Sequence, residues 1–231
     1  MITTEQEAAI RDVLATMPKL AVGVGTKEQA CSIAALNLAL TGTLTDDVPD
    51  CMSRVIGRWI IAVQDQMPAP IRDSAAWREL LVLAAGTGGE HEGERRALVL
   101  DWMWNALAVV QPRADAEGYG EAWATMLRER TVTSADAAAY AAAYAAADAD
   151  AAAYSAASAA ADAAAYSAAA TAAAEAADYA AADAAAGAYA AAAAAAWTAI
   201  DPISCLRRLV AVTDERALHP LAVQPTTGEG A

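Results

Sequence analysis

The chain has 231 residues, 57% of them hydrophobic, and carries 29 acidic and 15 basic side chains for a net charge of −14 at pH 7. This acidic balance disfavours direct binding to nucleic-acid backbones and to anionic membrane surfaces, because both need clustered Lys and Arg. Much of the hydrophobic fraction is alanine, which buries far less apolar area than leucine. We therefore expect the main core among the larger apolar residues before residue 130.

Helical signals follow one another through residues 1–130. A threonine before an acidic first turn predicts the first helix over residues 3–16. Apolar residues at three- and four-residue spacing then predict helices over 27–42, from 49 or 50 to about 67, from 74 to the glycines at 86–89, over 91–112 and over 115–130. The buried stripe of the third helix is expected at Met52, Val55, Ile56, Trp59, Ile60 and Val63. No β-type alternation appears, so the sequence predicts an all-α fold.

Alanine dominates the next part of the chain, with 44 alanines among the 62 residues from Ala135 to Ala196. Alanine is the strongest helix former, and the stretch holds no proline and only Gly187 as glycine. The remaining residues recur every fourth position, with two slips in phase that keep them on one side of a helix. We predict an alanine-rich helical module over residues 131–200, whose 62-residue alanine stretch forms either one extended helix of about 95 Å or a folded-back bundle.

One face of this module gathers tyrosine and acidic residues, and another is almost entirely alanine. Tyrosine is favoured at protein interfaces, and a bare alanine face lets a second helix approach closely. We expect the module to bind another protein or a second copy of itself. An alternative stays open in which the tyrosines only pack over neighbouring helices of the chain. The candidate interaction residues are Tyr140, Tyr144, Tyr154, Tyr166, Tyr179, Asp148 and Asp162.

The tail begins with Asp201 as a helix cap and Pro202 at the first helical position. Its short helix has an apolar face that we expect to dock on the rest of the chain, with a frayed end from Pro220 onward. The sequence thus divides into an N-terminal helical domain (1–130), the alanine-rich module (131–200) and a tail (201–231).

The stretch AAGTGGEHEGERR most resembles a binding site for a small ligand. Its glycines suit a backbone nest for a phosphate group at a helix start, and arginines follow one turn later. The candidate ligand-binding residues are Gly86, Gly88, Gly89, His91, Arg95 and Arg96. No strand precedes the glycines and no P-loop lysine follows them, so a glycine helix stop before a new helix with glutamates at its positive end is the stronger interpretation.

Catalytic and metal-binding patterns are weak in this sequence. Cys31, Cys51 and Cys205 form no CxxC pair and have no neighbouring histidine, which favours reduced, buried thiols. A metal site at His91 with Glu90 and Glu94 is less favoured than a solvated helix face. We therefore assign no catalytic residues, no metal and no cofactor. A charged N-terminal segment without a signal-peptide pattern favours a cytoplasmic protein.

Residues 30–68, the stretch 84–95 and the alanine array closing in WTAIDPISCLRRLVAV together resemble a group of alanine-rich proteins from actinobacteria and their phages. That group has no assigned activity. The array alone resembles bacterial immunity proteins of the Imm-5-like kind. The resemblance implies an intracellular accessory protein of bacterial or phage origin. We expect a non-enzymatic protein-interaction module that acts on a host defence factor or a DNA-processing enzyme; the alternative is a nucleotide or small-molecule binder that uses loop 86–96.

Overall fold

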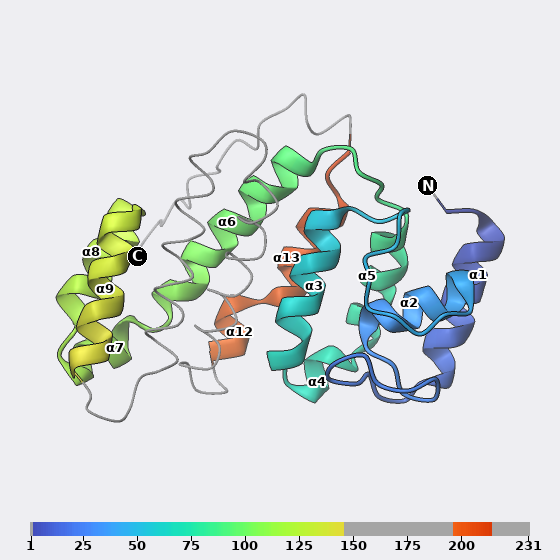
Figure 1. Cartoon of the computed structure of the whole chain (residues 1–231), viewed down its shortest axis with the longest axis horizontal. Coiled ribbons are helices and arrows are strands. Elements are labelled where there is room, and N and C mark those ends of the chain that lie inside the picture. The colour runs from blue at the N-terminus through green and yellow to red at the C-terminus, as the bar shows by residue number, and fades with distance from the viewer. Residues whose placement is uncertain (1, 146–195, 214–231) are drawn as a thin grey trace, which may run out of the picture.

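The computed structural model describes residues 2–145 and 196–213, and within these ranges the fold is all-α, as the sequence predicts (Figure 1). The only β-type contact among the described residues is an isolated bridge between Gly25 and Ala30. The helices are α1 (Thr4–Thr16), α2 (Ser32–Thr41), α3 (Arg54–Gln66), α4 (Ala69–Arg72), α5 (Ala75–Ala85), α6 (Glu92–Ala108), α7 (Gln111–Glu117), α8 (Gly120–Glu129), α9 (Val132–Ala145), α12 (Ala196–Ile200) and α13 (Pro202–Val210).

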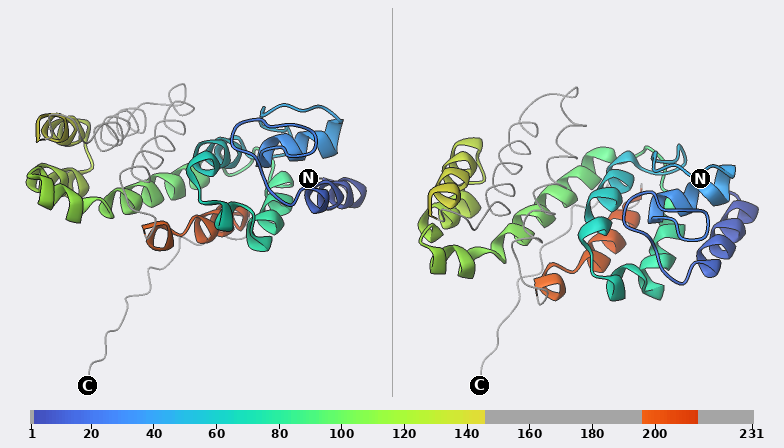
Figure 2. Two further views of the ribbon diagram at one scale, coloured as in Figure 1. Left: turned by 90° about the horizontal axis from the view of Figure 1, so that it is seen from below. Right: turned by 60° about the horizontal axis from the view of Figure 1, so that its bottom comes forward.

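Helix α6 connects the two ends of the molecule. Helices α1 to α5 gather at its N-terminal end and α7 to α9 at its C-terminal end, as both views in Figure 2 show. After the alanine-rich region the chain returns to this first group, where α13 packs against α3, α5 and α6, and α12 packs against α6. Segments far apart in the sequence therefore meet beside the N-terminal half of α6.

The hydrophobic core centres on α3 and on the tryptophans around it. All six residues of the stripe predicted for this helix are buried, with exposed fractions of 2% or less. Trp59 packs edge-on against Trp102, with ring centroids 5.2 Å apart, and lies 6.1 Å from Trp77. The same continuous core includes buried residues of α9, α12 and α13, so the returning tail is an integral part of it.

Side-chain caps set where several helices begin. The side chain of Thr3 accepts from the amide of Gln6 and the Gln6 side chain accepts from that of Thr3, a capping box that confirms the first helix start. Helix α2 begins five residues later than predicted, because residues 26–30 form a turn and Cys31 Sγ accepts the amide of Ala34. The α13 start confirms its prediction, since the Asp201 carboxylate accepts from the amide of Ser204 at 3.0 Å.

Further boundaries differ from those predicted: α6 ends at Ala108, so the last residues of the helix expected over 91–112 belong to α7. The single helix expected over 115–130 is divided into α7 and α8 at Gly118, whose φ of +89° lies in the left-handed region that glycine tolerates best. The short α4 lies between residues 67 and 74, where no helix is predicted from the sequence. Within the described ranges, no helix has the length and apolar character that crossing a bilayer requires.

Only the two ends of the predicted alanine-rich module fall in the described ranges, as α9 and α12. The choice between one extended helix and a folded-back bundle therefore lies outside the described residues. The proposed division into three parts stays a prediction.

Candidate functional site

The loop between α5 and α6, residues 86–91, is fastened to the start of α3. Thr87 Oγ1 accepts a hydrogen bond from the amide of Ser53 at 3.0 Å. The amide of Gly88, whose φ is +60°, donates to the carbonyl of Cys51 at 2.9 Å. Most residues with a side chain would be strained at this φ, so glycine favours the conformation in which the loop reaches α3.

Glu92, the first residue of α6, also caps the start of α3. Its Oε1 accepts from the backbone amide of Arg54 and its Oε2 from that of Val55, both at 3.1 Å. Ser53 Oγ accepts the amide of Ile56 at 3.2 Å. The first amides of a helix lack intrahelical partners, and here a carboxylate from another helix supplies them with acceptors and with favourable charge.

Arg95 is the buried centre of this region, with 2% of its surface exposed. Burial lowers the pKa of its guanidinium, and each nitrogen donates to backbone carbonyls in compensation. Because a guanidinium has five N–H groups, five acceptors satisfy it fully. Those carbonyls belong to Thr87, Gly88, Glu90, Leu209 and Val212, at 2.5–3.4 Å.

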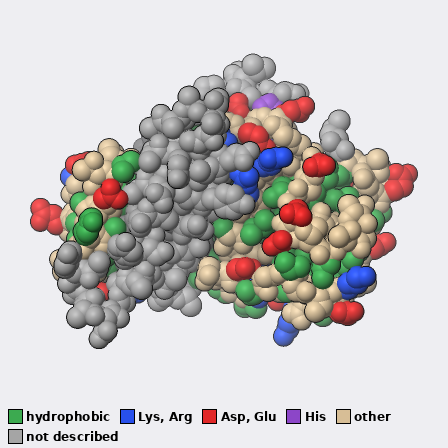
Figure 3. Space-filling view, in the orientation of Figure 1, with side chains coloured by type: hydrophobic (Ala, Val, Ile, Leu, Met, Phe, Trp, Pro, Cys, Tyr) green, Lys and Arg blue, Asp and Glu red, His purple; other side chains and the backbone are tan. Residues whose placement is uncertain are grey.

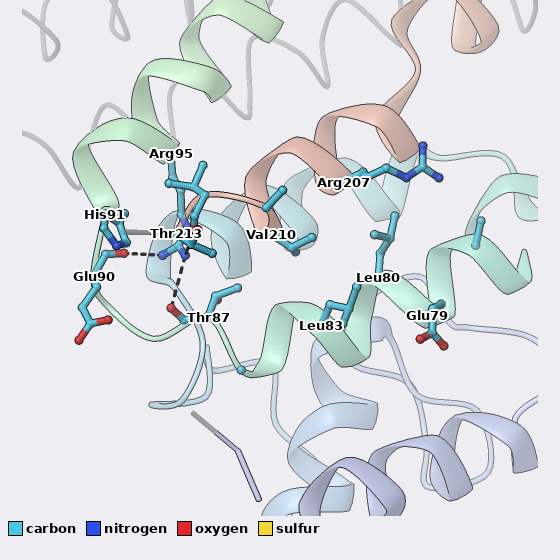
Figure 4. Close-up of a pocket in the computed structure, with 14 residues that line it drawn as sticks. Glu79, Leu80, Leu83, Thr87, Glu90, His91, Arg95, Arg207, Val210 and Thr213 are labelled. Carbon is cyan, nitrogen blue, oxygen red and sulfur yellow. Dashed lines mark hydrogen bonds between the residues drawn. The ribbon is translucent and has the colours of Figure 1, made fainter. Parts of the chain in front are cut away.

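This arrangement decides what the loop can bind. A phosphate nest needs unsatisfied backbone amides beside a cation. Here the amides of residues 86–88 each donate to a protein carbonyl, and three carbonyls of the loop accept from Arg95; Figure 4 shows those of Thr87 and Glu90. Neither Arg95 nor these three amides has a donor left for a phosphate group. Arg95 instead joins loop 86–91 to the end of α13.

A groove of about 720 Å³ lies beside the loop, between α5 and α13. In Figure 4, Leu80 and Leu83 of α5 face Val210 of α13 and form its apolar floor. Leu83 is 50% exposed in this groove. Polar side chains stand at the two ends of the groove: His91 and Glu90 at the loop, and Glu79 and Arg207 at the far end.

Two of the polar groups in the groove are held by neighbours. Glu79 accepts from Arg11 of α1 at 2.8 Å, and this hydrogen bond lowers the pKa of the Glu79 carboxyl. His91 adopts a left-handed backbone conformation before α6, with its Nδ1 4.0 Å from Glu94. The groove thus combines an apolar middle with positioned charges at its ends.

A second cavity, of about 380 Å³, lies on another side of the same loop, between the start of α3 and α6. Arg54 and Arg58, one turn apart on α3, and Arg96 of α6 contribute to its walls, together with Gly89. Figure 3 shows the corresponding group of basic side chains, in blue, over the starts of these two helices. This cavity concentrates positive charge on a chain that is strongly acidic overall.

The structure distributes the predicted ligand-binding residues over both sides of the loop. Gly86, His91 and Arg95 line the groove, whereas Gly89 and Arg96 line the arginine cavity. Gly88 is engaged with Cys51 and Arg95. The sequence analysis missed Arg54 and Arg58; their four-residue spacing on a helix with a buried opposite face was the available signal.

The candidate interaction residues fall partly in α9. In this helix Ala135, Ala138, Ala139 and Ala142 are buried, with exposed fractions of 0–4%, and α9 packs against α8. Asp136 is exposed and Tyr140 is 65% exposed on the other side. For Tyr144 the structure describes the helix but not the side chain. The remaining candidates, Tyr154, Tyr166, Tyr179, Asp148 and Asp162, lie outside the described residues.

The cysteines and acidic groups offer little for catalysis. Burial raises the pKa of the Cys205 thiol. Cys51 is only partly buried, and its burial also raises the pKa of its thiol. A thiol with a raised pKa is a poor nucleophile at neutral pH. In the part of the chain that the structure describes, no three His, Cys, Asp or Glu side chains come together in a way that could hold a metal ion.

Comparison with known proteins adds no family assignment. No protein-family model, no curated protein sequence and no solved structure matches the chain. Its function therefore has to be argued from the geometry of its own surfaces.

Proposed function

We propose that this protein is a non-enzymatic interaction protein that presents the tyrosine–aspartate face of its alanine-rich module to another protein. The observation that carries this proposal is the two-sided burial of α9. Its alanines are buried, while Asp136 and Tyr140 are directed away from the core. A helix that buries its small residues and exposes a large amphipathic one presents contact area at little entropic cost.

The start of α9 is fixed, which favours recognition by a preformed surface. The amide of Ser134 donates to Thr131 Oγ1 and the amide of Thr131 donates to Ser134 Oγ, both at 3.2 Å. Reciprocal bonds of this kind hold the first turn of a helix in place. A surface that is ordered before binding loses less conformational entropy on association.

The partner that fits this face is a protein, or a second copy of this chain. The net charge of −14 favours a partner with a basic or neutral surface and disfavours nucleic acid. A host defence factor or a DNA-processing enzyme, met in the cytoplasm, is the class of partner that the sequence resemblance suggests. The chain then acts by occupying a surface of that partner.

Capture by the full chain tests this proposal. Immobilised wild-type protein is expected to retain one partner in stoichiometric amount from a lysate of the organism that encodes it, or to form a defined oligomer by light scattering. The Tyr140→Ala variant should lose at least ten-fold in affinity for whichever species is found. Val22→Ala, at an equally exposed site in the loop between α1 and α2, should bind as the wild type does. Equal binding by both variants contradicts the proposal.

The groove between α5 and α13 supports a second candidate function, the binding of a small apolar molecule. Its volume of about 720 Å³ falls within the range of small-molecule sites, which are mostly apolar with a few placed polar groups. His91 and Glu90 supply such groups at one end. A ligand present at 100 times its dissociation constant would stabilise the protein by about 2.7 kcal/mol.

A thermal-shift screen of apolar compounds against the wild type and Leu83→Asp tests the groove. Leu83 is half exposed, so this variant is expected to fold. A compound that raises the melting temperature of the wild type alone supports the second candidate. A melting temperature that no compound changes argues against ligand binding in the groove and does not affect the proposal for α9.

A further inference from the structure

The groove between α5 and α13 has a positive charge at its far end that its own walls do not balance. Arg207 lines this end and is exposed. No carboxylate in the described part of the chain forms an ion pair with it. The residues one turn before and after it on α13, where a helical partner would stand, are all uncharged: Ile203, Ser204, Val210 and Ala211.

The acid at the same end of the groove, Glu79, is committed to another helix. Both of its carboxylate oxygens accept from the guanidinium of Arg11 on α1, one of them at 2.8 Å. In Figure 4 the Glu79 carboxylate points away from Arg207. A carboxylate held in paired hydrogen bonds by one guanidinium is fixed in its orientation. Glu79 therefore does not turn toward Arg207, and the guanidinium of Arg207 keeps its donors for a ligand.

The loop end of the groove has the opposite character. Glu90 lines it and is exposed, so an anionic ligand group at this end would meet a like charge. The cation at this end, Arg95, donates to five backbone carbonyls and has no donor left. The charges of the groove thus favour an anionic group beside Arg207 and disfavour one beside the loop.

The middle of the groove suits an elongated apolar body. Leu80 and Leu83 on one wall face Val210 on the other (Figure 4), and Leu83 is half exposed. From Glu79 to Ala85 the wall formed by α5 is about 9 Å long, at about 1.5 Å per helical residue. A chain of methylene groups laid along this wall would cover Leu83 and remove apolar surface from water.

From this arrangement we propose that the groove binds an amphipathic molecule with a single carboxylate. The carboxylate lies at Arg207, and the apolar body extends along Leu80, Leu83 and Val210 toward the loop. One guanidinium matches the two oxygens of one carboxylate in paired hydrogen bonds. The inference rests on the second candidate function and adds the chemical class of the ligand and its orientation. It is independent of the proposal for α9.

Titration calorimetry of the full chain with decanoate, below the concentration at which it forms micelles, tests the proposal. One saturable site per chain is expected. Arg207→Gln should weaken binding at least ten-fold, and so should Leu83→Asn, which removes apolar surface without adding charge. Arg208→Gln is the matched control, because Arg208 is the exposed neighbour on α13 and is not among the residues that line the groove. Decylamine, a cation with the same alkyl chain, should bind at least ten-fold more weakly than decanoate.

The outcomes that overturn the proposal are distinct. Equal binding of decanoate and decylamine, weakened for both by Leu83→Asn, would leave an apolar site in the groove and remove the carboxylate from Arg207. Decanoate binding that Arg207→Gln and Leu83→Asn both retain would place the ligand elsewhere. Absence of saturable binding by either compound would overturn this inference together with the second candidate function. Arg207→Lys, which keeps the charge but loses the paired geometry, should bind with an affinity between those of the wild type and Arg207→Gln.

Discussion

The Nε of Arg95 donates to the carbonyl of Leu209, 114 positions further along the chain. The same guanidinium binds three carbonyls of loop 86–91 and the carbonyl of Val212. One buried side chain therefore holds together the end of α5, the start of α6 and the end of α13. It also explains why a loop that looks like a phosphate nest in the sequence offers acceptors rather than donors.

Replacement of Arg95 should strongly destabilise the fold. Arg95→Met leaves several buried carbonyls without donors, so we expect a loss of about 3–5 kcal/mol in the free energy of unfolding, measured by urea denaturation. Arg95→Lys keeps the charge but has three N–H donors and no fork, so it should also be destabilised. Arg128→Met, on the surface, should change stability by less than about 0.5 kcal/mol. A stable Arg95→Met variant would contradict the role assigned to this residue.

The carboxylate of Glu92 should stabilise α3 although it belongs to α6. Glu92→Ala removes acceptors for the amides of Arg54 and Val55, and we expect a loss of about 1–2 kcal/mol in chemical denaturation. Glu94→Ala, two residues along the same helix, is the control, because Glu94 is exposed and its carboxylate lies 4.0 Å from Nδ1 of His91. Equal effects of the two substitutions would show that the cap contributes nothing.

Two helical glycines should respond in opposite directions to alanine. A Cβ on Gly57 would clash with the side chain of Val48, so Gly57→Ala requires the preceding loop to move and should lower the melting temperature. Gly93 has no atom within 4 Å of its Cβ position, so Gly93→Ala should raise stability by up to about 1 kcal/mol through helix propensity. Differential scanning calorimetry of the two variants checks both signs. Stabilisation by Gly57→Ala would show that Val48 does not pack closely there.

The thiols should differ in reactivity as their burial differs. Cys31 and Cys205 are buried and Cys51 is partly exposed. Since burial raises the pKa of Cys51, its reaction with Ellman's reagent at pH 8 should be slower than that of free cysteine and should accelerate as the pH rises. One thiol per chain should react in the native protein, three thiols per chain in the unfolded protein, and none in the native Cys51→Ser variant. Rapid reaction of two or more thiols per chain in the native protein would contradict the burial of Cys31 and Cys205.

The helices were largely predictable because their apolar spacing is regular, as the fully buried stripe of α3 illustrates. Helix boundaries were less predictable where the capping group comes from a distant segment of the chain. The start of α3 at Arg54, rather than near Pro49, depends on Glu92 and on Thr87, neither of which is local in sequence. Local propensity alone does not contain that information.

The sites were predictable only in outline. The four-residue repeat predicts two faces for the alanine-rich region; of the part described, α9 buries Ala135, Ala138, Ala139 and Ala142 and exposes Tyr140. The roles of Arg95 and Arg96 could not be told apart in sequence, because adjacent residues of a helix point about 100° apart and only packing of α13 decides which one is buried. The arginine cavity likewise exists only because α6 lies beside α3.

Photocrosslinking from α9 tests the central claim most directly. A photoreactive phenylalanine analogue at position 140 of the full chain, expressed in the organism that encodes it, should crosslink to one defined protein or to a second copy. The same analogue at position 22, also exposed but at the other end of the molecule, should give no such product. Matching crosslinks from both positions, or none from position 140, would contradict the claim that this face of α9 is a binding surface.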